Sequence, residues 1–313
     1  MNTDPTLRKK VTRWLEEAYE TEDNKACEEL ARKVLSVSPD NPEASLLLAE
    51  VFQGNEEEYR DRLRHVLEIL DQPSPGWAGF LSDGCLPEWL KAAALLIPQR
   101  LAFSLLGDEE GGEEEPAEAL AMAEELVKND PEGQTLGRLL QYGALLRLRR
   151  YREALKETIK DATDSPERAY TKALASFRLS GPCEESYQAV CSAIRIDPDL
   201  PFLMSGIWEM DDDEIEQDDR IHAMALVFGP LLEEDEQAAA WFNTPILVFG
   251  FLTGRLPEEV AQTLEPQLDE AGMGDMLKIA QGQLEALLQQ DPEQEPEKID
   301  ELAAQILAQM GDF

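Results

Sequence analysis

Arginine is the residue type in this sequence with the clearest potential for specific chemistry. Between Arg138 and Lys160 seven basic residues stand against two acidic ones, although the whole chain carries a formal net charge of −37. A guanidinium group can hold a carboxylate through two parallel N–H donors. Arg138, Arg147, Arg168 and Arg178 are therefore the candidate ligands for an acidic peptide or a C-terminal carboxylate. The alternative is that these arginines pair with glutamates of the same chain on a solvated face.

Histidine and cysteine form no recognisable catalytic or metal-binding pattern. His65 and His222 stand in unlike contexts, and the sequence contains no C-x-x-C pair, no H-E-x-x-H motif and no glycine-rich phosphate loop. We expect His65 to be packed or half-exposed on a helix. Cys183 and Cys191, eight residues apart on one predicted helix, are expected to be core thiols. We therefore predict no catalytic residue, no metal site and no cofactor.

Carboxylates are abundant but are not arranged as a known site. The segment DDDEIEQDD (211–219) has oxygen ligands but lacks the glycine and the spaced glutamate of a calcium-binding EF-hand loop. The segment GDEEGGEEEP (107–116) is typical of an acidic, solvated loop between two helices. Among 65 acidic residues no catalytic pair is singled out by spacing. A carboxylate-based enzyme in the C-terminal half is kept as an alternative.

The strong negative charge restricts the class of partner. An acidic surface repels the phosphates of nucleic acids and of anionic lipids, so we expect neither nucleic-acid nor membrane binding. The longest apolar stretch, 238–252, is interrupted by Asn243 and Pro245, and no apolar run typical of a signal peptide follows the first residues. Few and scattered cysteines are typical of a reduced, cytoplasmic protein.

Helices must position the arginines, and five prolines recur at the ends of helical patterns: Pro39, Pro73, Pro131, Pro166 and Pro198. Their successive separations are 34, 58, 35 and 32 residues. Three of the four lie near a period of about 34 residues, which is typical of stacked helical hairpins. The fourth accommodates an insertion near 71–90. Because proline lacks a backbone N–H and disfavours helix at the preceding residue, each is expected to end the second helix of a hairpin.

The predicted second helices share a stripe of small and apolar residues at fixed distances before these prolines. Twelve residues before lie Cys27, Ala119, Ala154 and Ser186; eight before lie Ala31, Ala123, Thr158 and Val190; four before lie Leu35, Val127, Ala162 and Ile194. Steps of four residues keep these positions on one face of a helix. In the preceding helix of the last repeat, Tyr170, Ala173, Leu174 and Phe177 form a matching apolar stripe.

The segments ALASFRLSGPCEESYQAVCSAIRIDP (173–198) and RRYREAL (149–155) combine a Leu-Gly-like pair, an aromatic residue, a small residue and a closing proline. Here the chain resembles the tetratricopeptide repeat (TPR) family, over about residues 5–200. The tryptophan usual near the start of a repeat is missing from these units. The resemblance implies a right-handed α-solenoid whose first helices line a concave groove. In that register Arg147, Arg168 and Arg178 face one concave surface.

A narrower resemblance covers KNDPEGQTLGRLLQYGALLRLRRYREA (128–154) and the segments that follow it. This part is similar to bacterial relatives of the suppressor-of-tumorigenicity-seven-like repeat proteins. Arg138 matches an arginine that those relatives carry at the start of this helix, and Pro198 with Pro201 match their later Pro-x-x-Pro. The polar motif before that arginine is not reproduced in residues 132–137. The resemblance implies an architecture and transfers no activity.

The regular period is lost after residue 200. Helical patterns continue at 211–232, where the acidic residues would cap the helix, and at 234–252, 257–270, 273–290 and 296–310. We therefore predict an all-α fold with a TPR-like repeat domain at 1–200 and an acidic helical bundle at 201–313. The bundle is expected to cap the stack. An independent domain is the alternative.

The expected function is that of a non-catalytic scaffold or adaptor that binds a protein or peptide in the groove. Two other functions compete with it. One is a subunit that forms homo-oligomers through the apolar segment WFNTPILVFGFL (241–252). The other is the carboxylate-based enzyme already named.

Overall fold

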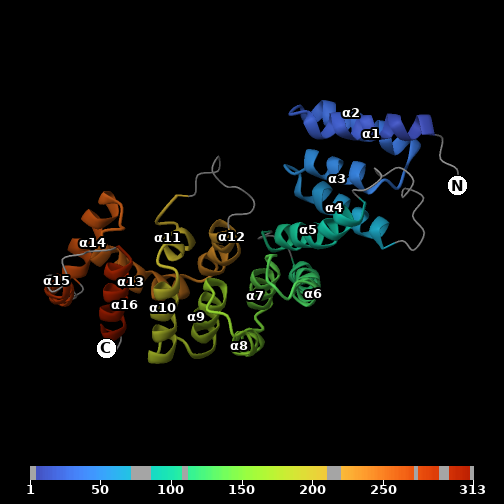
Figure 1. Cartoon of the computed structure of the whole chain (residues 1–313). Coiled ribbons are helices and arrows are strands. Elements are labelled where there is room, and N and C mark those ends of the chain that lie inside the picture. The colour runs from blue at the N-terminus through green and yellow to red at the C-terminus, as the bar shows by residue number, and fades with distance from the viewer. Residues whose placement is uncertain are drawn as a thin grey trace. The chain divides into compact units, whose positions relative to one another are not determined.

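The computed structural model describes residues 5–71, 86–107, 112–209, 220–270, 274–288 and 296–310. Within these ranges the chain forms sixteen α-helices and no β-strand (Figure 1). Helices that are neighbours in sequence pack against one another as pairs. The prediction of an all-α fold is therefore confirmed.

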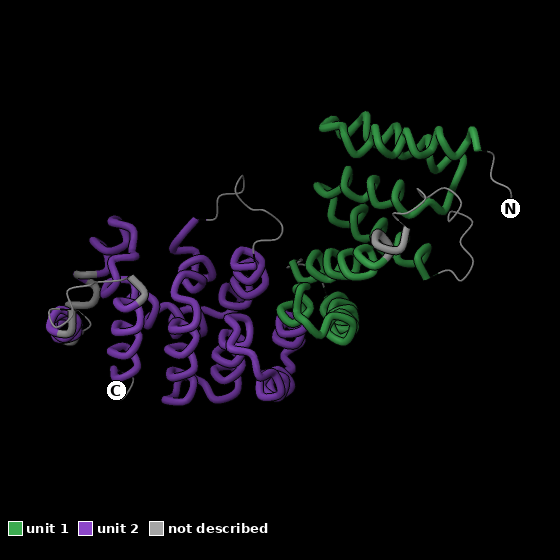
Figure 2. Tube along the Cα trace, viewed as in Figure 1, with its two compact units in different colours: residues 1–140 green, residues 141–313 purple. Residues whose placement is uncertain are grey.

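The chain divides into two compact units, residues 1–140 and 141–313 (Figure 2). This division falls inside α7 (Gly137–Arg147) and not at residue 200, where the sequence loses its period. The two divisions rest on different properties, because one follows contacts and the other follows the repeat pattern. A terminal bundle over 201–313 stays a prediction.

The first unit consists of paired helices together with the start of α7. Their bounds are α1 (Pro5–Glu20), α2 (Asn24–Val37), α3 (Pro42–Val51), α4 (Glu56–Leu70), α5 (Leu86–Gly107) and α6 (Glu114–Asn129). Several helices begin where a side chain accepts from an otherwise unpaired backbone N–H: Asp23 from Lys25, Asn41 from Ala44 and Asn55 from Glu58. Most of the predicted insertion lies outside the described residues, as do residues 108–111 of the predicted acidic loop.

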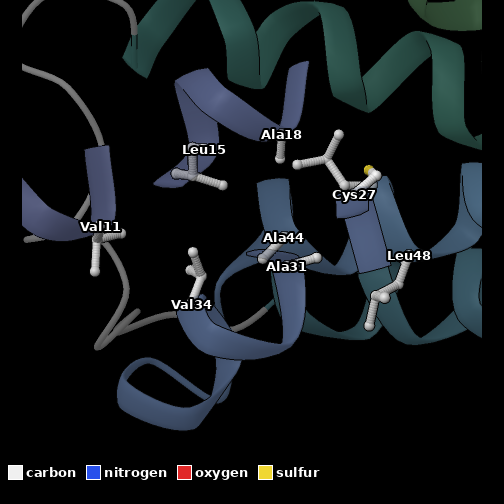
Figure 3. Packing of buried hydrophobic residues seen from close by; sticks show 9 residues of the cluster. Val11, Leu15, Ala18, Cys27, Ala31, Val34, Ala44 and Leu48 are labelled. Atoms are coloured by element: carbon white, nitrogen blue, oxygen red, sulfur yellow. The ribbon is translucent and has the colours of Figure 1, made fainter. Parts of the chain in front are cut away.

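The core of the first three helices contains the small residues that the sequence pattern singled out. Figure 3 shows Cys27 and Ala31 of α2 among side chains of α1 and α3 such as Val11, Leu15 and Leu48. All of these side chains are buried. Small residues on α2 allow its backbone to approach both neighbours closely, which explains why α1 also contacts α3.

Two ion pairs join α4 to α6. Arg60 Nη1 lies 3.0 Å from Glu115 Oε1, and Arg64 holds both carboxylate oxygens of Glu118 at 2.9 and 3.0 Å. Arg60 also donates to the carbonyl oxygen of Ser104 at 2.8 Å. Because the contacts advance in the same direction along both helices, α4 and α6 run parallel.

The second unit contains the rest of α7 and nine further helices. Their bounds are α8 (Tyr151–Lys160), α9 (Pro166–Ser180), α10 (Glu184–Ile196), α11 (Leu200–Met204), α12 (Arg220–Glu233), α13 (Glu236–Thr253), α14 (Glu258–Glu270), α15 (Gly274–Leu288) and α16 (Pro296–Met310). The last four agree within two residues with the predicted helical patterns. The acidic start of the pattern at 211–232 lies outside the described residues up to 219.

Polar contacts at both ends place α9 beside α12. Glu167, buried in the first turn of α9, pairs with Arg220 at the start of α12. Near the other end, Arg178 Nη2 donates to the carbonyl oxygen of Leu231 at 2.7 Å. Both pairs are separated by 53 residues in sequence, so the two helices run parallel and in register.

The last helix packs back onto α10, as Figure 1 also shows. Tyr187 Oη donates to the carbonyl oxygen of Leu307 at 3.0 Å, and Gln188 Nε2 donates to that of Ala308 at 2.9 Å. Arg195 lies 3.3 Å from Glu301. The order of these contacts shows that α10 and α16 are antiparallel.

The predicted stripe is confirmed at its first two positions. At the third position Ile194 is buried, Leu35 and Val127 are half-buried, and Ala162 is exposed. The eight residues at twelve and eight positions before the prolines are all buried, and so are Tyr170, Ala173, Leu174 and Phe177. Ala162 is exposed because α8 ends at Lys160. The Asp161 carboxylate accepts from Tyr142 Oη at 2.9 Å and from Thr163 N at 3.0 Å, and these contacts fix the non-helical connection.

Candidate functional site

The structure brings two of the predicted arginines to one place, the turn between α12 and α13. Arg147, at the end of α7, donates through Nη1 to Glu234 Oε1 at 3.3 Å. Arg178, in the last turn of α9, pairs with Asp235 as well as with the Leu231 carbonyl. The two guanidinium groups therefore hold consecutive carboxylates of the same chain.

The partners of Arg178 explain why this arrangement is structural. Asp235 is the N-cap of α13 and accepts from the backbone N–H groups of Gln237 at 2.9 Å and Ala238 at 3.2 Å. The Ala238 N–H is the main cause of a lowered pKa for Asp235, and Gln237 and Arg178 add to the effect. Arg178 also places a cation at the carboxyl end of α12, where the helix dipole is negative. An external carboxylate would have to displace these contacts.

The other two predicted arginines do not join this pair. Arg168, in the first turn of α9, donates through Nε to the carbonyl oxygen of Thr158 at 2.8 Å and through Nη1 to that of Thr163 at 3.0 Å. It therefore fixes the connection between α8 and α9. That Arg147, Arg168 and Arg178 face one concave surface stays a prediction, although Arg168 does not share the carboxylate partners of the other two. Arg138 is half-buried in the first turn of α7 and belongs to the first unit.

Exposed positive charge lies instead on α8 and the turn before it. We define the basic stripe as Arg149, Arg152 and Lys156, whose side chains are exposed and form no ion pair within 4.0 Å with a described carboxylate. Their neighbours are neutralised, because Arg150 pairs with Glu153 and Lys160 with Glu157, each at 2.5 Å.

An apolar residue and a backbone outlier accompany the basic stripe. Ile159, one turn after Lys156, is 81% exposed, the largest value for a large apolar side chain in the described ranges. Arg149 is the one non-glycine residue of the described chain with a positive φ, at 57°. The charge count of the sequence located this region. The count did not say which basic residues lie beside a glutamate on the helix surface and which do not. That difference separates Arg150 and Lys160 from the basic stripe.

The structure describes His65, Cys183 and Cys191, for which the sequence made specific expectations. The side chain of His65 is 53% exposed, 3.7 Å from Glu68, so the expectation of a half-exposed residue is confirmed. Cys191 is buried, as predicted. Cys183 is half-buried and not a core thiol, because α10 begins at Glu184 and Cys183 is its N-cap.

The apolar segment proposed for self-association is largely covered within the second unit. In α13, Phe242, Ile246 and Phe249 are fully buried. Trp241 stacks on Phe177 with ring centroids 4.2 Å apart, and Phe242 meets Tyr170 edge-on at 6.2 Å. These side chains attach α13 to α9, which leaves little of the segment for a second copy.

An open apolar groove of about 530 Å³ lies in the first unit between α4, α5 and α6, beside Leu70, Pro98 and Met122. Asp71, Glu125 and Asn129 also line it. The described residues contain no group of three or more metal-ligating side chains, and no described helix is long and apolar enough to cross a membrane. The segment 211–219 lies outside the described residues.

Comparison of the chain with protein-family models and with curated proteins found no match.

Proposed function

We propose that this protein is a non-catalytic, cytoplasmic scaffold that binds another protein or a peptide on a stack of helical hairpins of the TPR kind. The observation that carries the proposal is the in-register, parallel pairing of α9 and α12, fixed by Glu167 with Arg220 and by Arg178 with Leu231. Parallel packing of non-consecutive helices is what a stack of hairpins requires. The pairing of α4 with α6 in the first unit is of the same kind.

The proposal includes a right-handed superhelical arrangement and a C-terminal bundle that covers the end of the stack. The packing of α16 on α10 supports such a cap, since a terminal hairpin must hide its last apolar face. A scaffold held by ion pairs and buried helix contacts is ordered before it binds. A partner therefore loses little affinity to ordering of the scaffold.

The structure gives less support to binding of an acidic ligand by Arg147 and Arg178 than to binding on the outward faces of the helices. Glu234 and Asp235 already occupy Arg147 and Arg178. An acidic ligand at that place would exchange one set of ion pairs for another and gain little. Binding on outward helix faces avoids this competition.

Affinity capture tests the scaffold function. The tagged full-length chain is immobilised, native lysate is passed over it, and retained proteins are identified by mass spectrometry. We expect one or a few proteins to be retained at near-stoichiometric levels and to bind again as purified components. An unrelated monomeric protein of matched size and negative charge serves as the control. Retention of the same proteins by the control, or of none by the chain, would contradict the proposal.

A further inference from the structure

We infer that the basic stripe of α8, together with Ile159, is a docking surface for an acidic segment of a partner protein that also carries an aliphatic side chain. The inference rests on the proposed scaffold function and specifies its binding surface. Within the part of the second unit that the structure describes, these four side chains form no ion pair and none of them is buried.

Helical geometry places the surface on one side of α8. Arg152, Lys156 and Ile159 follow the spacing i, i+4, i+7 and share the exposed face. Ala154 and Thr158, on the opposite side, are buried. Arg149 precedes the helix by two residues, so the surface is roughly 15 Å long at a rise of about 1.5 Å per residue. An extended segment of about five residues could cover it.

Charge complementarity selects the partner. The glutamates of α8 form their ion pairs with Arg150 and Lys160, although the charge of Lys156 also acts on Glu153. The basic stripe therefore presents three exposed cations that form no ion pair within 4.0 Å with a described carboxylate. In a chain with a net charge of −37, such a site attracts a short acidic segment while the surrounding surface repels acidic chains in other orientations. The two arginines can each hold a carboxylate through two N–H donors.

The backbone at Arg149 is an independent observation. The N–H of Arg150 bonds to the carbonyl oxygen of Leu145 at 2.9 Å, and that of Arg149 bonds to Leu146 at 3.0 Å. This is the pattern in which glycine is favoured at the left-handed position. The chain uses glycine at its other described positive-φ positions, such as Gly181 and Gly254. An arginine held in this conformation carries backbone strain, which is typical of functional positions.

Ile159 separates a protein segment from a nucleic acid as the occupant. An 81% exposed isoleucine beside the charges can be covered by an aliphatic side chain of a peptide. A phosphodiester backbone offers no matching apolar group. A long polyanion would also meet repulsion from the rest of the acidic chain.

Fluorescence anisotropy tests the inference directly. The probe is a fluorescein-labelled peptide, EDLEELDE, titrated with the full-length protein at low ionic strength. We expect Arg152→Glu/Lys156→Glu to weaken binding at least tenfold and Ile159→Ser to weaken it about threefold. The matched control is Lys33→Glu/Lys278→Glu, which makes the same change in net charge at two exposed lysines and should change affinity less than twofold. Circular dichroism spectra establish that each variant is folded.

Arg149→Gly is a variant whose weaker peptide binding could not be attributed to unfolding. It should weaken peptide binding about threefold because it removes one positive charge. It should also raise the melting temperature, because glycine adopts the positive φ of this position without strain. Absence of peptide binding by the wild type, or equal losses in both double variants, would overturn the inference. Tighter binding of a labelled oligouridylate by the same residues would also overturn it. If a captured partner is retained equally by Arg152→Glu/Lys156→Glu, the scaffold function survives and the docking surface does not.

Discussion

Arg255 holds both carboxylate oxygens of Asp300, at 2.5 Å from Nη1 and 2.8 Å from Nη2. Its Nε also donates to Asp199 Oδ1 at 2.9 Å, and its guanidinium lies 5.6 Å from the centre of the Phe249 ring. Arg255, two residues after the end of α13, thus joins the start of α11 to the first turns of α16. Three segments far apart in sequence meet at one side chain.

Replacement of this arginine should loosen the second unit. We expect Arg255→Met to lower the free energy of unfolding by about 2–3 kcal/mol, because it leaves the mostly buried Asp300 carboxylate without its cation. Urea denaturation measures the change. Arg195→Met is the matched control, since Arg195 also pairs with α16 but is 62% exposed; it should cost less than about 1 kcal/mol. Equal losses in both variants would contradict a special role for Arg255.

Arg178 should behave as a structural residue. We expect Arg178→Ala to destabilise the fold by about 1–2 kcal/mol, because it removes a cation from the end of α12 and the partner of Asp235. In a double-mutant cycle with Asp235→Asn, the two losses should not add. If the two losses in the free energy of unfolding added, the ion pair between Arg178 and Asp235 would contribute nothing to stability. Charge reversal of Arg147, Arg168 and Arg178 would therefore perturb folding and could not report on binding alone.

Gly250 in α13 marks a close approach of this helix to Phe202 of α11 and to Leu256 of the following loop. A Cβ atom there would lie 2.7 Å from Leu256 Cδ2 and 2.7 Å from Phe202 Cε1. We expect Gly250→Ala to destabilise the protein by about 1–3 kcal/mol although alanine favours helix. Gly282→Ala on α15 is the control, since its Cβ would meet nothing within 4 Å and should stabilise the protein by about 0.5–1 kcal/mol. A stabilising Gly250→Ala would contradict the packing.

The cysteines of α10 should differ in reactivity. Hydrogen bonds from the backbone and hydroxyl of Ser186 lower the pKa of Cys183, whereas burial raises the pKa of Cys191 to about 12. At pH 8 more Cys183 is thiolate, and the thiolate is the nucleophile. In a Cys85→Ser background, iodoacetamide should therefore label Cys183 at least tenfold faster than Cys191, as followed by peptide mass spectrometry. Equal labelling rates would show that α10 opens more readily than its packing on α16 allows.

Sequence reasoning succeeded where the property was local and periodic. Small residues such as Cys27 and Ala154 identified the buried face of their helices because burial repeats with the helical turn. It failed where a neighbouring contact ended a helix. Ala162 is exposed and not part of the buried face, because the connection after α8 is fixed by the contact of Asp161 with Tyr142. Cys183 is only half-buried because it is the N-cap of α10.

The partners of the arginines could not be predicted in the same way. Arg178 meets Leu231 and Asp235, which are 53 and 57 residues further along the chain. Such contacts depend on how α9 and α12 pack, which residue spacing alone does not determine. The basic stripe could have been predicted from the sequence, because the spacing of three residues in the pairs Arg150–Glu153 and Lys160–Glu157 brings their side chains together on a helix.

The antiparallel contact between α10 and α16 imposes an order on biosynthesis. Tyr187 and Gln188 bind residues 120 positions further along the chain. At a translation rate of about 5–20 residues per second, α10 emerges from the ribosome roughly 6–24 s before its cover exists. During that interval the apolar side of α10 is open to chaperones and to other nascent chains.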